Sequence, residues 1–182
     1  AYAMLSWSTT LLTTKGFSLD DAGNAVALAG FTSMIGAVLA GVAVRRFGSF
    51  RVMMANNAVL VAVLLALVLA VERMAAVPSA DDAGLVSMLV GAAGAFFSAN
   101  VAVMYVIMAL GYPQSCRSAG IGFGIFMSRV GAVAATGLGG VLLEMGGAST
   151  IPFYSVLIAA AVVVALAAFV IDRHVPPLAG SA

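Results

Sequence analysis

The sequence is poor in charge: Asp, Glu, Lys and Arg make up only 8% of its 182 residues, whereas 63% are hydrophobic. Water-soluble domains carry about 25% charged residues. A chain with so few cannot cover a water-facing surface, so a soluble globular protein is excluded. The chain also lacks the basic patch that binding to nucleic acid requires.

Cysteine and histidine occur once each, as Cys116 and His174. A single cysteine excludes an internal disulfide, and no spacing typical of metal ligands or of a nucleophile–base pair occurs. Gly120, Gly122 and Gly124 lack the preceding strand that a dinucleotide-binding loop needs, so they indicate helix packing. We therefore expect no enzyme, no metal and no organic cofactor.

The start of the chain lacks an initiator Met, a charged n-region and a cleavage site, so it does not resemble a signal peptide. It opens instead within an apolar run. We interpret the sequence as a fragment that begins inside a helix.

Long apolar runs make up most of the chain. A helix that spans a bilayer needs about 20 largely apolar residues, and the absence of two-residue alternation excludes barrel strands. The opening run, residues 1–14, is too short to span alone and is expected to be the last part of a helix. The full spans are expected at 22–44, 52–71, 85–110, 118–143 and 150–171. We therefore predict an all-α polytopic membrane protein with six helices, the first truncated.

The basic residues predict the orientation of these spans. One set of short loops and the tail contain five of them, Arg45, Arg46, Arg51, Arg117 and Arg173. The other loops contain only Lys15 and Arg73, together with most of the acidic residues. Basic loops stay in the cytoplasm, which predicts a cytoplasmic (inner) membrane protein with its C-terminal tail inside, unless the asymmetry is chance.

The pattern F-x-S-x-[IV]-G-A-V occurs twice, at Phe31–Val38 and Phe126–Val133, a shift of 95 residues. An odd number of spans separates the two copies, so the helices that carry them run in opposite directions. This pattern is typical of the inverted 3+3 repeat in each six-helix half of major facilitator transporters. The alternative is an accidental match between helices rich in small residues. Met34 in the first copy corresponds to Arg129 in the second.

Polar residues separate two kinds of span. The opening run and the spans 22–44, 85–110 and 118–143 carry polar side chains and are expected to line an interior. The spans 52–71 and 150–171 are largely aliphatic and are expected to face lipid. Small residues also recur every fourth position in the span 118–143, which allows close helix packing, either static or sliding; they are Gly120, Gly124, Ser128, Ala132, Thr136 and Gly140.

Arg129 is the most informative residue. It lies about 18 Å along its helix from Arg117, near the bilayer centre, where arginine costs roughly 2.5–3.5 kcal/mol. It is expected to face an aqueous cavity or an anion, and its planar guanidinium suits a carboxylate. The alternative is a structural arginine bound by carbonyl groups or by an acid elsewhere.

We expect four further residues to meet the substrate. The aromatic side chains Phe126, Trp7 and Tyr105 are positioned to contact a ring, and Asn100 is a polar partner. The alternatives are plain packing for Phe126 and bridging between helices for Asn100 and Tyr105.

Several motifs together resemble the aromatic acid:proton symporters of the major facilitator superfamily. Tyr112-Pro113, Arg117 with Gly120, and Ser128-Arg129-Val-Gly131-Ala132 match the tenth-to-eleventh-helix region of that family. The opening Trp7 to Ser18 is similar to its seventh helix and the loop that follows. The resemblance covers the chain as the C-terminal half of a twelve-helix transporter, whose N-terminal half is absent from this sequence.

The stretch from Gly41 through Arg45 and Arg46 to Gly48 resembles the superfamily loop G-x-x-x-D-R-x-G. The resemblance implies a gating loop on the cytoplasmic face, although Arg45 replaces the acidic residue. The alternative is a basic loop that only fixes orientation and touches anionic lipid.

The resemblance implies a secondary active transporter that moves a small organic anion by proton symport and alternating access, and the substrate that it implies is an aromatic carboxylate such as a hydroxybenzoate. Its expected partners are the anion, protons, the lipid bilayer and the missing half, and the proton gradient supplies the energy. The alternatives are a major facilitator carrier for another organic anion or drug, and a non-transporting, truncated membrane protein.

Overall fold

The computed structural model describes residues 2–73, 79–146 and 149–171, and the predicted tail residues Arg173 and His174 lie outside this part. The described residues form six α-helices and no strand. Their bounds are α1 Tyr2–Thr14, α2 Leu19–Phe47, α3 Ser49–Arg73, α4 Ala80–Gly111, α5 Arg117–Gly146 and α6 Ile151–Val170. The five helices after α1 are long and apolar enough to cross a membrane. The prediction of an all-α integral membrane protein is confirmed for these residues.

Helices α2 and α4 begin where the sequence carries capping signals. Ser18 caps α2 by accepting a hydrogen bond from the Asp21 amide at 3.0 Å. Ser79 and Asp82 form a reciprocal capping box at the start of α4. These side chains satisfy backbone amides that a first helical turn leaves without partners.

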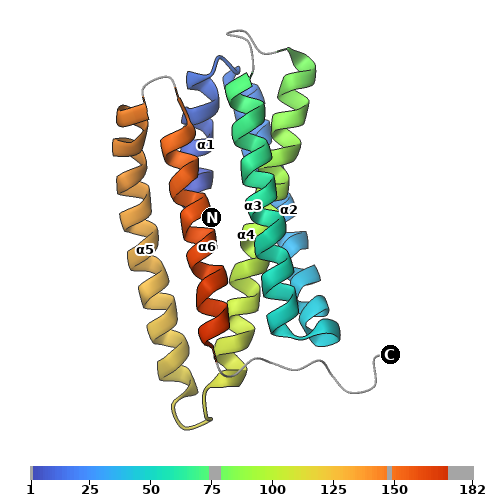
Figure 1. Cartoon of the computed structure of the whole chain (residues 1–182), viewed down its shortest axis with the longest axis vertical. Helices are drawn as coiled ribbons and strands as arrows, with labels where there is room; N and C mark the ends of the chain where they lie inside the picture. Colours follow the sequence, from blue (N-terminus) through green and yellow to red (C-terminus); the bar gives the residue numbers. More distant parts are fainter. Residues whose placement is uncertain (1, 74–78, 147–148, 172–182) are drawn as a thin grey trace.

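Successive helices alternate in direction along one bundle axis (Figure 1). The α2–α3 and α4–α5 connections lie at the lower end, and the last residues of α1, α3 and α5 lie at the upper end. Arg45, Arg46, Arg51 and Arg117 therefore lie at one end of the bundle, as the charge pattern predicts. Lys15 and the acidic residues that begin α2 and α4 lie at the other.

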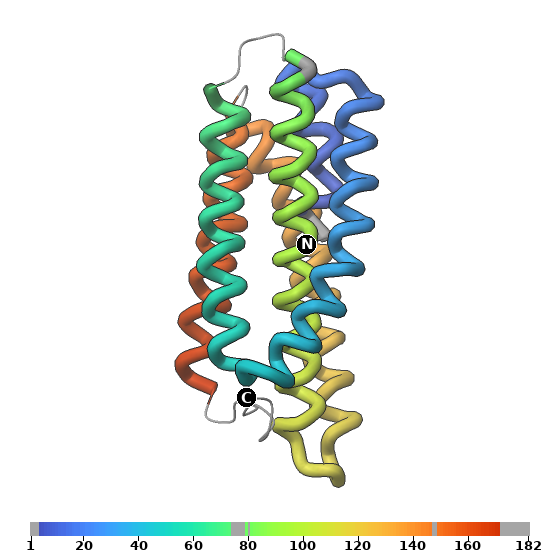
Figure 2. Tube along the Cα trace, turned by 90° about the vertical axis from the view of Figure 1, so that its right-hand side faces the viewer, coloured from blue at the N-terminus to red at the C-terminus, as the bar shows by residue number. Residues whose placement is uncertain are grey.

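Helices α1, α2, α4 and α5 form a closed ring of contacts, and α3 and α6 pack beside this ring. Helices α3 and α6 pack side by side, and Figure 2 shows them together on the left, with α2 on the right-hand side of the bundle. Helix α4 packs against α2, α3 and α5, whereas α1 packs against α2 and α5. This arrangement leaves one side of α2 and most of α5 without a neighbouring helix.

The helix contacts have an internal symmetry. When α1, α2 and α3 are exchanged with α4, α5 and α6, the pair α2–α4 becomes α5–α1, α1–α2 becomes α4–α5, and α2–α3 becomes α5–α6. The pair α3–α6 maps onto itself. Among the closely packed pairs of described helices, only α3–α4 lacks its counterpart.

Helices α2 and α4 meet through small residues. A Cβ added to Gly36 would lie 2.9 Å from Ala95 Cα, and one added to Gly94 would lie 2.8 Å from the Ala29 carbonyl oxygen. The Thr32 hydroxyl donates to the Gly91 carbonyl at 2.6 Å. The backbones approach so closely because no side chain separates them, as is typical of membrane helices.

Candidate functional site

Arg129 lies in the middle of α5, twelve residues after its first residue, Arg117. Every other charged side chain that the structure describes lies in an interhelical connection or within about one turn of a helix end. Arg129 is exposed on the bundle surface. Within the described chain, Arg129 is thus the one charged residue far from a helix end. It lies about 18 Å from the nearest end of α5, on a face that the bundle does not cover.

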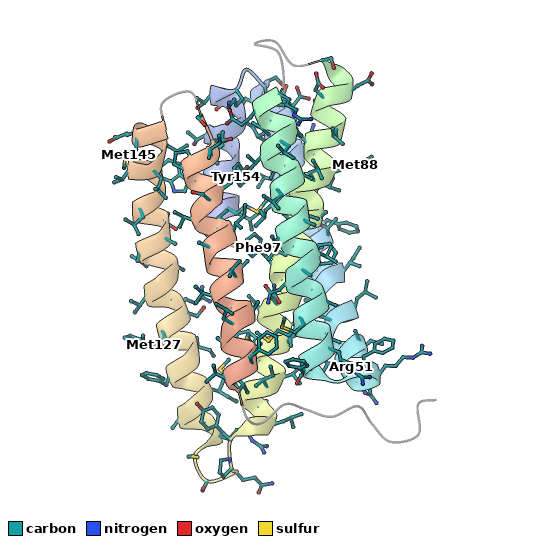
Figure 3. The ribbon with its side chains drawn as sticks, viewed as in Figure 1. Arg51, Met88, Phe97, Met127, Met145 and Tyr154 are labelled. Carbon is teal, nitrogen blue, oxygen red and sulfur yellow. The ribbon has the colours of Figure 1, made fainter. Side chains whose placement is uncertain are left out.

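Helix α5 is exposed on almost all sides. Gly139 is its only buried residue among those described, and Figure 3 shows Met127 and Met145 along its outer edge. Phe126, three residues before Arg129, is 61% exposed. An aromatic ring and a guanidinium three positions apart are neighbours on a helix surface. They offer one apolar and one cationic contact to the same small molecule.

The corresponding face of α2 is exposed to the same extent. Phe31 is 64% exposed and Phe126 61%; Ile35 is 46% and Val130 48%; Val38 is 68% and Val133 76%. Each pair is separated by the 95-residue shift of the repeated pattern. The two helices therefore present equivalent uncovered faces, which differ in having Met34 on α2 and Arg129 on α5.

Trp7 connects α1 to α5. Its indole Nε1 donates to the Thr136 carbonyl at 2.9 Å, and its ring packs over Gly139 and Gly140. The side chain is half-buried. In this structure Trp7 acts in helix packing, and its ring contacts small residues of α5 ten or more positions after Phe126.

The structure separates Asn100 from the exposed face of α5. Asn100 is 8% exposed, and its Nδ2 donates to Asn57 Oδ1 of α3 at 3.2 Å. This bond joins α4 to α3, which is the helix bridge given as the alternative to substrate contact. Tyr105, on the same helix, is exposed.

The small residues of α5 contact neighbouring side chains at both ends of the row. Gly120 packs against the ring of Tyr112, Gly124 against the Met108 sulfur, and Gly140 against Trp7. Ala132 is half-buried and accepts a hydrogen bond from the Thr136 hydroxyl at 2.9 Å, whereas Ser128 is exposed. The two ends of this row of small residues therefore pack α5 against the end of α4 and against α1.

The segment expected to be a gating loop is helical except at Gly48. Arg45 and Arg46 lie in the last turn of α2, and α3 begins at Ser49. Gly48 has a φ of 83°, a conformation that favours glycine, and this residue alone reverses the chain. Gly41 lies about one turn before Arg45, where an added Cβ would meet nothing within 4 Å. The basic residues are thus exposed on the last turn of α2, next to a short turn in which Gly48 and Ser49 are buried.

Sequence reasoning missed a polar cluster at the upper end of the bundle. Glu72, in the last turn of α3, accepts hydrogen bonds from the Thr150 amide at 2.6 Å and the Thr150 hydroxyl at 2.8 Å. Its other oxygen pairs with Lys15 Nζ at 3.0 Å. The carboxylate therefore caps α6 and also ties the α1–α2 connection to α3. Pairing across 78 residues leaves no local signal.

Sequence reasoning also missed buried amides on α3. Asn56 Nδ2 donates to the Phe96 carbonyl of α4 at 2.9 Å, next to the Asn57–Asn100 pair. Two adjacent asparagines in an otherwise aliphatic span were a signal of a helix contact, because polar side chains in membranes bond across helices.

Comparisons of this chain with protein-family models, with curated proteins and with solved structures found no match.

Proposed function

We propose that this chain is the C-terminal six-helix part of a major-facilitator-type secondary transporter, which moves a small organic anion by proton symport and alternating access. The substrate class that fits best is an aromatic carboxylate such as a hydroxybenzoate. The observation that carries the proposal is Arg129, an exposed cation in the middle of a membrane helix, with Phe126 beside it on the same face.

The chemistry of the face supports an anionic aromatic ligand. A guanidinium presents two parallel N–H donors that match the two oxygens of a carboxylate. In a low-dielectric region such a pair is much stronger than in water, and binding would relieve part of the cost of holding Arg129 away from water. The neighbouring ring of Phe126 supplies an edge or face contact to an aromatic substrate.

The symmetry of the bundle supports a transporter architecture. When the two halves of the chain are exchanged, every closely packed helix pair except α3–α4 maps onto a pair that is also packed, and the uncovered faces of α2 and α5 are equivalent. Transporters built from inverted repeats bind substrate near the bilayer midplane, at the interface between repeats or halves. A second six-helix unit packed over these faces would enclose Arg129 in a central cavity.

Proton coupling requires a group that gains and loses a proton within the membrane. The acidic residues that the structure describes lie at or near helix ends, so this group is expected in the other half of the transporter.

Uptake of a radiolabelled hydroxybenzoate into proteoliposomes tests the proposal. Proteoliposomes that contain the full-length transporter, with both halves, should accumulate the label when the outside is acidic, and accumulation should collapse with a protonophore. Arg129→Gln should abolish uptake, and Arg129→Lys should retain only a small part because a lysine does not bind bidentately. Met34→Gln, at the equivalent place on α2, is the matched control and should transport. Normal uptake with unchanged apparent affinity in both Arg129 variants would refute the role of this residue.

A further inference from the structure

A second feature of the bundle, remote from Arg129, is a groove of about 600 Å³ between α2, α3 and α4. The two walls are α2 and α3, which diverge upward from the turn at Gly48, and the floor is α4 (Figure 2). The floor consists of Ala95, Phe96 and Ala99, and the short alanine side chains leave room between the two walls. The volume falls within the roughly 300–1,000 Å³ typical of ligand sites.

The shape of the groove suits a single hydrocarbon chain. On α2 it extends from Thr32 to Phe47, which corresponds to about 22 Å along the helix axis. One leaflet of the hydrocarbon core is about 15 Å thick. The groove therefore extends from the lower end of the bundle beyond the depth of a leaflet, and its lining is almost wholly apolar.

The lower end of the groove is cationic. Arg51, in the first turn of α3, lines the groove beside Phe47, and Figure 3 shows Arg51 at the lower end of the bundle. Arg45 and Arg46 lie on the last turn of α2 at the same end, and Arg46 lies over the Phe47 ring. No acidic residue in the described ranges forms an ion pair with these three arginines.

From this arrangement we propose that the groove binds one anionic phospholipid, with an acyl chain between α2 and α3 and the headgroup phosphate at Arg51. Within a bilayer, the apolar groove alone does not discriminate between lipids, because lipid tails are as apolar as its walls. The headgroup decides the selectivity, since a cluster of arginines at the membrane surface attracts anionic lipid. This binding does not depend on the substrate proposed for Arg129.

The test is native mass spectrometry of the protein purified from vesicles of equimolar phosphatidylglycerol and phosphatidylcholine with identical acyl chains. The wild-type chain should retain one phosphatidylglycerol in clear preference to phosphatidylcholine. Arg51→Ala should reduce retention of phosphatidylglycerol about five-fold, the effect expected for one arginine at the surface. Ala55→Trp, which places a large ring in the groove from α3, should remove both lipids.

Two matched variants act as controls. Arg117→Ala removes an arginine at the same end of the bundle but outside the groove, and Ala58→Trp adds a ring to the exposed side of α3 beside the groove. Both should retain phosphatidylglycerol as the wild type does. Equal retention of the two lipids, unchanged retention in Arg51→Ala or Ala55→Trp, or a lipid-free dimer that places a second copy in the groove would overturn the proposal.

Discussion

At the residue scale, Gly137 and Gly139 of α5 lie two positions apart in very different surroundings. A Cβ on Gly139 would lie 2.6 Å from Trp7 Cδ1, whereas one on Gly137 would meet nothing within 4 Å. The indole of Trp7 is held in place by its bond to the Thr136 carbonyl. Gly139 is therefore the residue that permits α1 and α5 to associate.

This contrast predicts that Gly139→Ala displaces the Trp7 ring and destabilises the protein by about 1–3 kcal/mol, the usual effect of overpacking. Gly137→Ala should be neutral or slightly stabilising, because alanine favours the helix. The midpoint of thermal unfolding in detergent measures both. An equal effect of the two substitutions would show that Trp7 does not pack here.

At the element scale, the closest contact is that of α2 with α4, and it depends on glycine. Gly36 and Gly41 lie on the same helix, but only Gly36 faces the backbone of Ala95. Gly36→Ala should force the helices apart, because backbone atoms cannot move aside as a flexible side chain can. We expect a loss of at least about 2 kcal/mol or a failure to fold, and no such loss for Gly41→Ala, measured by unfolding in detergent.

A second prediction at this scale concerns Glu72, which joins three elements at the upper end of the bundle. Glu72→Gln removes the ion pair with Lys15 and weakens the cap on α6. Amide hydrogen exchange at Ile151, Phe153 and Tyr154 should therefore become faster, with α3 itself little changed. Glu144→Gln, at an exposed position of α5, is the control. Unaltered exchange in Glu72→Gln would contradict the capping role.

At the scale of the whole molecule, the sequence predicted the helices well and their mutual contacts less well. Apolar length and charged gaps determine the spans, and α2 to α5 extend those expected by only a few residues at each end. The Glu72–Thr150 contact joins distant segments, so no local pattern predicts it. The adjacent asparagines of α3 indicate a helix contact but do not identify Asn100 as the partner of Asn57. Periodicity also did not predict that a single positive-φ glycine would replace the loop at Arg45 and Arg46.

Orientation is also a property of the whole molecule, and the native cysteine reports it. Cys116 is exposed in the α4–α5 connection, at the same end as the basic residues of the α2–α3 turn. Because basic ends stay in the cytoplasm, a membrane-impermeant maleimide should label Cys116 in inside-out vesicles and not in intact cells. Asp81→Cys in a Cys116→Ser background should show the opposite pattern. Labelling of Cys116 from outside would reverse the topology.

The central claim, that Arg129 receives a carboxylate, is tested most directly by equilibrium binding. Titration of the purified full-length transporter with a labelled hydroxybenzoate, in competition with the unlabelled acid or with its neutral amide, measures how much the charge contributes. The wild type should prefer the acid by at least about ten-fold, as expected for a charge-assisted bidentate pair, and Arg129→Gln should lose that preference. An undiminished preference for the acid in Arg129→Gln would contradict the claim.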